Sequence, residues 1–411
     1  MKPLIFVNAV LALALSLSMP ASPWEFDEPL FFQALQRYDP GAHHPPPPGY
    51  PLFIGAGNLA RMVMPSDFEA LRAVSLAASA IAFLMLALAF RNLSGDLTTG
   101  TVGAALFYFS PVMLVHATLP ISEPGALALL ATALYFAGRS SPAWFAVFAA
   151  LTVGWRIQFA IFVVPLFLVA VVLMPRGRDR GIALGAFTLV CLAWLVPLAI
   201  AVGGVAQMVQ FETGQGQYFA AQDANEARGG WTTAMIATRF IAHPWGLKIG
   251  SLPLLALAAA GALVALMRRR LPVALTAAGA AYIAFALWGM DPADGVRYAI
   301  PFVLVTAFFA SVGAVAAARR LSLPVALLPA LFAAVSLVYV SPVLSQRRAS
   351  ASPPLRAIEH ARASYPKGAV AIYELPLWPH ATYFLRDFSP LRLDDAMAAY
   401  HDRPEDRKSV V

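Results

Sequence analysis

Segments long and apolar enough to cross a lipid bilayer recur along most of this 411-residue chain. A helix that spans the ~30 Å hydrocarbon core needs about 17 to 25 mainly apolar residues. The spans beside His116 and Arg156 are short, as is typical of half-helices or re-entrant segments. The predicted fold class is therefore an all-α polytopic membrane protein. Its eleven predicted spans are residues 4–21, 71–90, 101–118, 122–138, 142–155, 157–174, 182–203, 247–267, 272–289, 297–318 and 323–343.

The composition agrees with this class and excludes several others. Hydrophobic residues make up 59% of the chain and charged residues 12%, whereas a soluble domain has roughly 25% charged residues. The net charge of +7 does not indicate a nucleic-acid partner, because most of the surplus lies in short turns next to spans. Cys191 is the sole cysteine and lies within an apolar span, which excludes a disulfide framework and a thiolate metal site.

Basic residues near the ends of spans predict the orientation, because they are retained on the cytoplasmic side. With the N-terminus in the cytoplasm, the long polar segments 22–70, 204–246 and 344–411 lie outside. We therefore expect a multi-pass protein of the bacterial cytoplasmic (inner) membrane, with an extracytoplasmic active site and C-terminus. The basic residues that this orientation places in the cytoplasm are Lys2, Arg91, Arg139, Arg176, Arg178, Arg180, Arg268 to Arg270, Arg319 and Arg320.

The first apolar segment has two interpretations. Lys2, the apolar run and the residues after Met19 also fit a cleaved signal peptide. Retention is favoured, since cleavage would leave the next polar loop without its membrane anchor.

Two regions follow from these features. Residues 1–343 form the predicted transmembrane domain. In residues 344–411, the helix-like run "PPLRAIEHARASYP" leads into the strand-like "GAVAIYEL", and a polar tail begins near Asp402. We expect a small extracytoplasmic α/β segment there, and the alternative is a loosely ordered tail.

Acidic residues mark the outer ends of two spans. Asp27 and Glu28 follow the first span, among aromatic and apolar neighbours that favour a raised pKa and a base of useful strength. The alternative for both is an ordinary solvated loop charge. Glu123 begins the fourth span, either as a residue that favours the helix dipole or as a further functional acid.

The first external loop contains "HHPPPPGY", residues 43–50. Four consecutive prolines predict a stiff polyproline II rod, and Gly49 then predicts a turn. His43 and His44 are adjacent, which is poor geometry for chelating one metal ion.

Two arginines break the positive-inside pattern. Arg156 and Arg297 lie on the predicted outer side, where a guanidinium is suited to bind two oxygens of a lipid phosphate. The alternative is a plain ion pair, for instance between Arg297 and Asp291 or Asp294. The glycine-rich loop 204–246 is predicted to close over a substrate.

Four motifs in this order resemble those of integral-membrane glycosyltransferases of the C-type (GT-C) fold, the superfamily of protein O-mannosyltransferases and aminoarabinose transferases (family 39-like). "FDEPLFFQAL" is similar to the Asp-Glu motif of their first external loop, "HHPPPPGYPLFIGAG" to the His-Pro-Pro-Gly stretch that follows, "SEPGALALL" to their second acidic element, and "VRYAIP" to an Arg-Tyr-x-x-Pro element that opens a late span. The match covers the whole membrane region, whereas residues 344–411 match only in position.

The resemblance implies transfer of a sugar from a polyprenyl-phosphate donor to a glycan, lipid or protein acceptor outside the cytoplasmic membrane, with Asp27 as catalytic carboxylate. Four prolines followed by Gly-Tyr, where the protein mannosyltransferases have Gly-Lys, speak against a protein acceptor.

The mechanistic hypothesis assigns a role to each candidate residue. Asp27 takes the proton from the acceptor, while Glu28 and Glu123 orient Asp27, the acceptor or the sugar. Arg297, with Tyr298 in the same motif, and Arg156 bind the phosphate, and His44 and Tyr50 shape the donor pocket. A divalent cation held by Asp27, Glu28 and Glu123 stays open. The alternative function is a transporter or flippase for a lipid-linked sugar, which should place polar residues near the bilayer midplane.

Overall fold

The computed structural model describes residues 2–218, 220–221, 229–246, 248–268, 270–367, 373–374, 378–388 and 391–392. Each of the eleven predicted spans corresponds to a helix or to a pair of consecutive helices. These helices are α1 (Lys2–Ser18), α4 (Asp67–Ser94), α5 (Leu97–Tyr108) with α6 (Pro111–His116), α7 (Glu123–Gly138), α8 (Pro142–Trp155), α9 (Ala160–Val172), α10 (Gly177–Ala201), α13 (Lys248–Arg268), α14 (Leu271–Gly289), α15 (Gly295–Tyr298) with α16 (Ile300–Arg320), and α17 (Leu327–Ala349).

Not all of these helices have the length that a full crossing needs. Among the described residues, five helical stretches are long and apolar enough to span a membrane alone: Asp67–Ser94, Gly177–Ala201, Leu271–Gly289, Ile300–Arg320 and Leu327–Ser364. Helix α8 has 14 residues, which corresponds to roughly 21 Å at about 1.5 Å per residue. The short pieces at His116 and Arg156 are therefore as predicted: α6 ends at His116, and Arg156 separates α8 from the 3-10 helix η2 (Ile157–Phe159).

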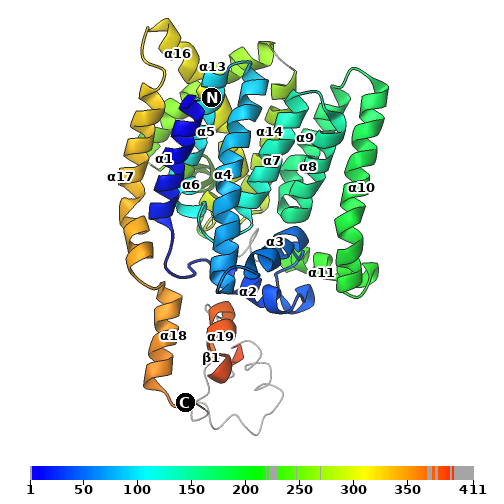
Figure 1. Ribbon diagram of the computed structural model, residues 1–411, viewed down its shortest axis with the longest axis vertical. Coiled ribbons are helices and arrows are strands. Elements are labelled where there is room, and N and C mark those ends of the chain that lie inside the picture. The colour runs from blue at the N-terminus through cyan, green and yellow to red at the C-terminus, as the bar shows by residue number, and fades with distance from the viewer. Residues whose placement is uncertain are drawn as a thin grey trace.

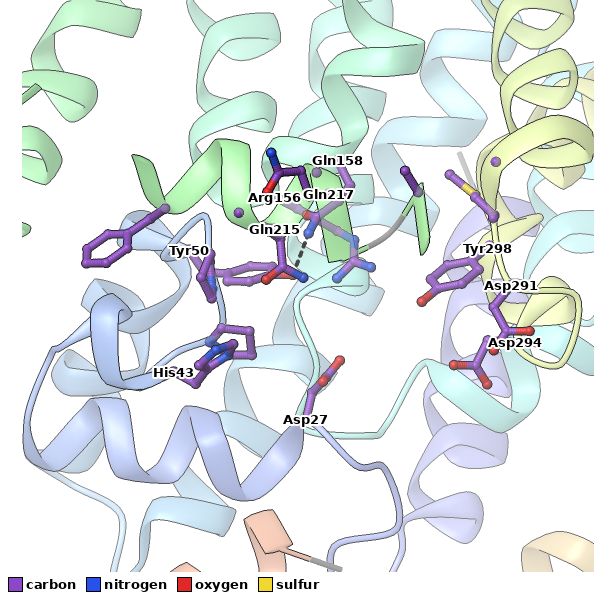
Figure 2. A pocket seen from close by; sticks show the side chains of 18 of the residues that line it. Asp27, His43, Tyr50, Arg156, Gln158, Gln215, Gln217, Asp291, Asp294 and Tyr298 are labelled. Carbon is purple, nitrogen blue, oxygen red and sulfur yellow. Dashed lines mark hydrogen bonds between the residues drawn. The ribbon is translucent and has the colours of Figure 1, made fainter. Parts of the chain in front are cut away.

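The polar segments gather at one end of the helix bundle, opposite the N-terminus (Figure 1). They form α2 (Glu28–Gln36), η1 (Pro40–Ala42), α3 (Pro51–Arg61), α11 (Val205–Tyr218), α12 (Thr233–Ile241), η4 (His243–Trp245), α18 (Pro353–Ser364), α19 (Trp378–Phe384) and η5 (Arg386–Phe388). The predicted first external loop and α11 line a large cavity at this end (Figure 2). The described parts of residues 22–70, 204–246 and 344–411 thus lie at the same end of the bundle, and the side of the membrane that this end faces stays a prediction.

The C-terminal segment differs in part from the prediction. Helix α17 continues to Ala349, beyond the predicted boundary at 343, and α18 follows within the stretch predicted as helical. Strands β1 (Tyr373–Glu374) and β2 (Leu391–Arg392) form one short parallel pair. Most of the strand-like stretch 368–375 and the tail from residue 402 lie outside the described residues, so the α/β segment stays a prediction.

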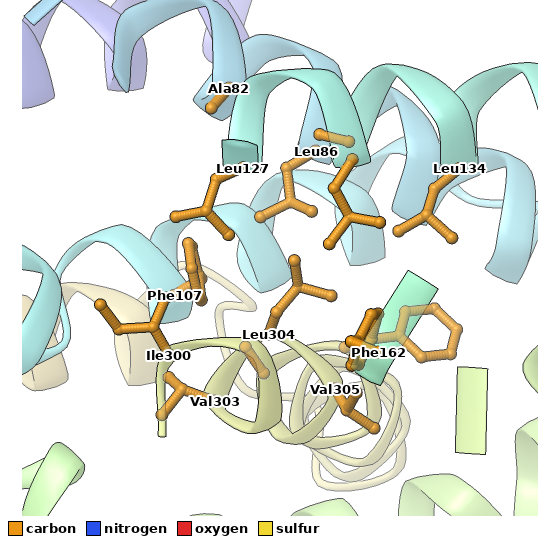
Figure 3. Packing of buried hydrophobic residues seen from close by; sticks show 14 of the residues in the cluster. Ala82, Leu86, Phe107, Leu127, Leu134, Phe162, Ile300, Val303, Leu304 and Val305 are labelled. Atoms are coloured by element: carbon orange, nitrogen blue, oxygen red, sulfur yellow. The ribbon is translucent and has the colours of Figure 1, made fainter. Parts of the chain in front are cut away.

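The core lies where α4, α5, α7, α9 and α16 pack together (Figure 3). Phe107 of α5, Leu127 of α7 and Leu304 of α16 are fully or almost fully buried within it. Helices α13 and α16 approach closely enough that a side-chain carbon at Gly261 would collide with the backbone carbonyl of Phe309. Small residues let helix backbones approach in membranes, where van der Waals packing drives helix association.

Candidate active site

A cavity of about 1570 Å³ opens at the polar end of the bundle. Its walls come from the first external loop, the α8–α9 junction, α11, the end of α14 with the loop that follows, and α19. Figure 2 shows Asp27, Tyr50, Arg156 and Tyr298 around this space. Segments far apart in sequence therefore contribute to one site.

Asp27 is held at the start of α2 with its carboxylate directed into the cavity (Figure 2). Its backbone carbonyl accepts from the N–H groups of Leu30 and Phe31, and the Pro29 ring at the start of the helix favours this geometry. Phe31 is fully buried against Phe53, which fixes the helix beneath the cavity. The Asp27 side chain remains 31% exposed. Burial among its neighbours raises the pKa of this carboxyl above its usual range, although Arg297 and Arg156 act in the opposite direction.

Arg297 is the centre of the charged cluster. Its Nε atom lies 2.6 Å from Oε1 of Glu123, its Nη2 atom 3.5 Å from Oδ2 of Asp27, and its Nη1 atom 3.5 Å from Oε2 of Glu25. The guanidinium is buried, with 7% of the side chain exposed, and it still lines the cavity. The alternative ion pairs with Asp291 or Asp294 do not form within 4.0 Å among the described residues, and three other carboxylates take their place.

Glu123 joins the two candidate arginines. The same Oε1 atom that contacts Arg297 lies 3.2 Å from Nη2 of Arg156. Arg156 also donates to Oγ of Ser122 at 2.7 Å, and its guanidinium lies over the ring of Tyr50 at 5.8 Å. Glu123 is buried and does not line the cavity, whereas Arg156 does. The Glu123 carboxylate therefore lies beneath the cavity wall, where it holds both guanidinium groups in position.

Glu28 points away from the cavity. It is fully buried, and its Oε2 atom accepts the backbone N–H of Trp24 at 2.8 Å. Its Oε1 atom has no hydrogen-bond partner among the described residues. Burial raises the pKa of Glu28 well above its usual range, and the nearby charge of Glu25 adds to this effect. Asp27 thus faces the cavity, whereas the adjacent Glu28 hydrogen-bonds within the loop.

The proline-rich stretch does not form the predicted straight rod. The N–H of Gly49 donates to the carbonyl of Pro46 at 3.0 Å, and the backbone of His44 pairs with that of Asp39. Gly49 has a φ of 104°, so the predicted turn is present, and a side chain there would meet the hydroxyl of Tyr38. The chain folds back because these hydrogen bonds close it into a compact loop.

This folding changes which histidine reaches the cavity. His43 lines the cavity, whereas His44 does not. Tyr50 is buried at the cavity wall, and its hydroxyl accepts from Nε2 of Gln158 at 2.8 Å. Pro46 and Pro47 complete this side of the site.

Tyr298 and two further aspartates lie across the cavity from Tyr50 (Figure 2). Arg239 of α12 donates to the carbonyls of Pro292 and Ala293, at 3.2 and 3.0 Å, and so holds the loop that carries Asp291 and Asp294. Burial raises the pKa of the Asp294 carboxyl. Residues of α11 form one wall of the cavity, and closure of the segment 204–246 over a substrate stays a prediction.

The sequence interpretation missed Glu25 and its partner Arg347. The Oε1 atom of Glu25 lies 3.8 Å from Nη2 of Arg347 and 4.0 Å from Nε2 of His116. Arg347 also donates to the carbonyl of Val115 at 2.9 Å, and it lies over the ring of Trp24. One signal was available, because Arg347, like Arg156 and Arg297, lies at the predicted outer end of a span.

The carboxylates of the site gather around an arginine. No group of three or more histidine, cysteine, aspartate or glutamate side chains is arranged to hold a metal ion in the part of the chain that the structure describes. Glu25, Asp27 and Glu123 each face the guanidinium of Arg297.

Known proteins with a similar fold were found among solved structures, and none was found by sequence. The sequence matches no protein-family profile and no curated protein. Among solved structures, the chain is similar to ArnT from Cupriavidus metallidurans bound to undecaprenyl phosphate, with 13% identity over 98% of this chain and 88% of that one and a TM-score of 0.66. It is also similar to an oligosaccharyltransferase from Archaeoglobus fulgidus tethered to an acceptor peptide, with 13% identity, 95% of this chain and 63% of that one covered, and a TM-score of 0.59. Both are GT-C proteins, and this chain therefore has the polytopic membrane fold of the GT-C glycosyltransferases.

Proposed function

We propose that this protein is a membrane glycosyltransferase that moves a sugar from a polyprenyl-phosphate donor to an acceptor hydroxyl at the outer face of the bacterial cytoplasmic membrane. One observation carries the proposal above the others. The carboxylate of Asp27 and the guanidinium of Arg297 lie 3.5 Å apart in a cavity of about 1570 Å³, so a base and a phosphate-binding group face the same space.

Arg297 and Arg156 are suited to bind the phosphate of the donor. An arginine side chain has five N–H donors, and the three carboxylates around Arg297 engage three nitrogen atoms of its guanidinium. The donors that remain on Nη1 and Nη2, together with those of Arg156 next to it, are available to phosphate oxygens. The likeness to ArnT, whose solved structure is bound to undecaprenyl phosphate, supports a lipid phosphate as part of the donor.

The reaction is an inverting substitution at the anomeric carbon. The acceptor oxygen attacks this carbon as Asp27 takes the hydroxyl proton, and the bond from carbon to the phosphate oxygen breaks with its electron pair on the oxygen. Arg297 and Arg156 stabilise the charge that grows on the leaving phosphate. The raised pKa of Asp27 makes its carboxylate a stronger base than an exposed aspartate.

The other candidate residues serve this arrangement indirectly. Glu123 holds both arginines, which keeps their guanidinium groups at the cavity wall. Tyr50 and Tyr298 line the cavity from opposite sides, and His43 lines it in place of His44. Glu28 stabilises the loop that carries Asp27 through the Trp24 backbone.

The test compares wild type with Asp27→Asn in lipid nanodiscs, using radiolabelled polyprenyl-phosphate sugars and extracted envelope acceptors. General bases contribute about 10²- to 10⁴-fold, so we expect transfer to fall by at least about 10²-fold while the donor still binds. Asp39→Asn is the matched control, because Asp39 belongs to the same external loop and does not line the cavity.

Equal transfer by the Asp27→Asn variant would remove this residue from the chemistry. Movement of the donor across the bilayer without any sugar transfer would instead favour a flippase.

A further inference from the structure

The cavity is larger than a donor headgroup requires. Sites for small molecules are about 300 to 1000 Å³, whereas this cavity measures about 1570 Å³. The charged groups that suit a phosphate, Arg156, Arg297 and Asp27, occupy only one region of its surface. The remaining wall has a different chemical character.

Helix α11 lines that wall with amides. Gln210, Gln215 and Gln217 all line the cavity, and Figure 2 labels Gln215 and Gln217 among its side chains. Each glutamine offers one carbonyl acceptor and two N–H donors. In the described part of the chain, no hydrogen bond engages the amides of these three residues. Thr213 on the same helix adds a hydroxyl to the wall.

An indole ring lines the same cavity. Trp378 of α19 lines the cavity with its ring 6.0 Å from that of Phe26 and 6.2 Å from that of His43. Helix α19 is held on α2, since Nε2 of Gln33 donates to Oγ1 of Thr382 at 3.2 Å. The indole is therefore presented on a supported element, and its flat apolar face suits the C–H face of a sugar ring.

The arrangement of charge decides which ligand fits. The described residues of α11 that line the cavity carry no charge, and the additional acids Asp291 and Asp294 lie on the opposite side, next to Tyr298 (Figure 2). The α11 wall offers no cation to an anionic acceptor. The arginines that line the cavity, Arg156 and Arg297, are the proposed ligands of the donor phosphate. The amides can instead hydrogen-bond to the hydroxyl groups of a sugar, and the indole can pack against its C–H face.

We infer that the amide wall of α11 and Trp378 form a subsite for a neutral, hydroxyl-rich glycan, and that this glycan is the acceptor. The assignment of the glycan as acceptor rests on the proposed transferase function. The subsite itself depends only on binding. The same chemistry would also suit the sugar of the donor, so the experiment separates the two sources.

The experiment measures binding of neutral oligosaccharides to the full chain in nanodiscs, by tryptophan fluorescence and calorimetry. The Gln215→Leu/Gln217→Leu double variant and Trp378→Leu should each weaken binding about tenfold or more, because each loses contacts that the bound sugar makes. Gln207→Leu is the matched control, since Gln207 lies on the same helix and does not line the cavity. Affinity for polyprenyl phosphate, with and without its sugar, should stay unchanged in all three.

Three results would overturn the inference. One is a wild type that binds no neutral oligosaccharide, and a second is a double variant that binds it as the control does. The third is a double variant that loses affinity only for the sugar-loaded donor, which would assign the amides to the donor. The subsite is tested by binding alone, whereas the transferase proposal is tested by transfer in Asp27→Asn, so failure of one and failure of the other are separate outcomes.

Discussion

Arg297 brings together carboxylates from two distant parts of the chain, Glu25 and Asp27 in the first external loop and Glu123 at the start of α7. Glu25 also faces Arg347 and His116, so it connects the candidate active site to the outer end of α17. Each negative charge near Asp27 makes loss of its proton less favourable. The pKa of Asp27 therefore depends on the charges of the whole cluster.

The pH dependence of transfer tests this connection. Asp27 must be ionised to act as a base, so kcat/KM should fall as the pH falls through its pKa, which burial places above the usual range of an aspartate. The charge of Glu25 contributes to this rise, and Glu25→Gln should shift the acidic limb of the profile to lower pH. Asp39→Asn should leave the limb in place. An unchanged limb in Glu25→Gln would mean that this charge does not act on the base.

At the scale of elements, close helix packing holds the site in place. Arg297 lies in α15, directly before α16, and α16 lies against α13 through Gly261 and Gly313. A side-chain carbon at Gly313 would collide with the backbone carbonyl of Leu257. Backbone atoms cannot move aside as the end of a flexible side chain can.

The corresponding prediction compares two glycine substitutions. Gly313→Ala should destabilise the protein by about 1 to 3 kcal/mol, as is typical of overpacking. Gly185→Ala in α10 has open space around the new side chain, and it should be neutral or slightly stabilising because alanine favours helix. Thermal unfolding in detergent measures both. A smaller loss for Gly313→Ala than for Gly185→Ala would contradict the close approach of α13 and α16.

At the scale of the whole molecule, the polar elements and the cavity lie at one end of the bundle and the N-terminus at the other (Figure 1). A lipid-linked donor needs this arrangement, because its phosphate stays at the membrane surface while its chain stays in the bilayer. The excess of arginine at the opposite end predicts which end faces the cytoplasm.

Cysteine labelling tests that orientation. Cys191 is the sole cysteine, so Cys191→Ser provides a cysteine-free background. A membrane-impermeant maleimide applied to intact cells should label Ala42→Cys, which is exposed in the first external loop, and should not label Arg178→Cys until the membrane is permeabilised. Labelling of Arg178→Cys alone in intact cells would place the cavity on the cytoplasmic side.

The sequence by itself determined the fold class, the positions of the eleven apolar spans and which segments between them are long and polar. Long apolar runs can satisfy their backbone hydrogen bonds in a bilayer only as helices, so these features depend on local composition. It also indicated Asp27, Arg156, Glu123 and Arg297, because charged residues beside spans are costly and conspicuous.

Only the tertiary structure decided how these residues are divided between the cavity and its supports. Side-chain direction depends on contacts between segments far apart in sequence, such as those of Arg297 with Asp27 and Glu123. Within the first loop, Glu28 is buried whereas Asp27 faces the cavity. The same contacts fold the proline stretch back, select His43 over His44, and bring Glu25, Arg347, α11 and Trp378 to the site. No local sequence pattern predicts these contacts, because each one depends on how the helices pack.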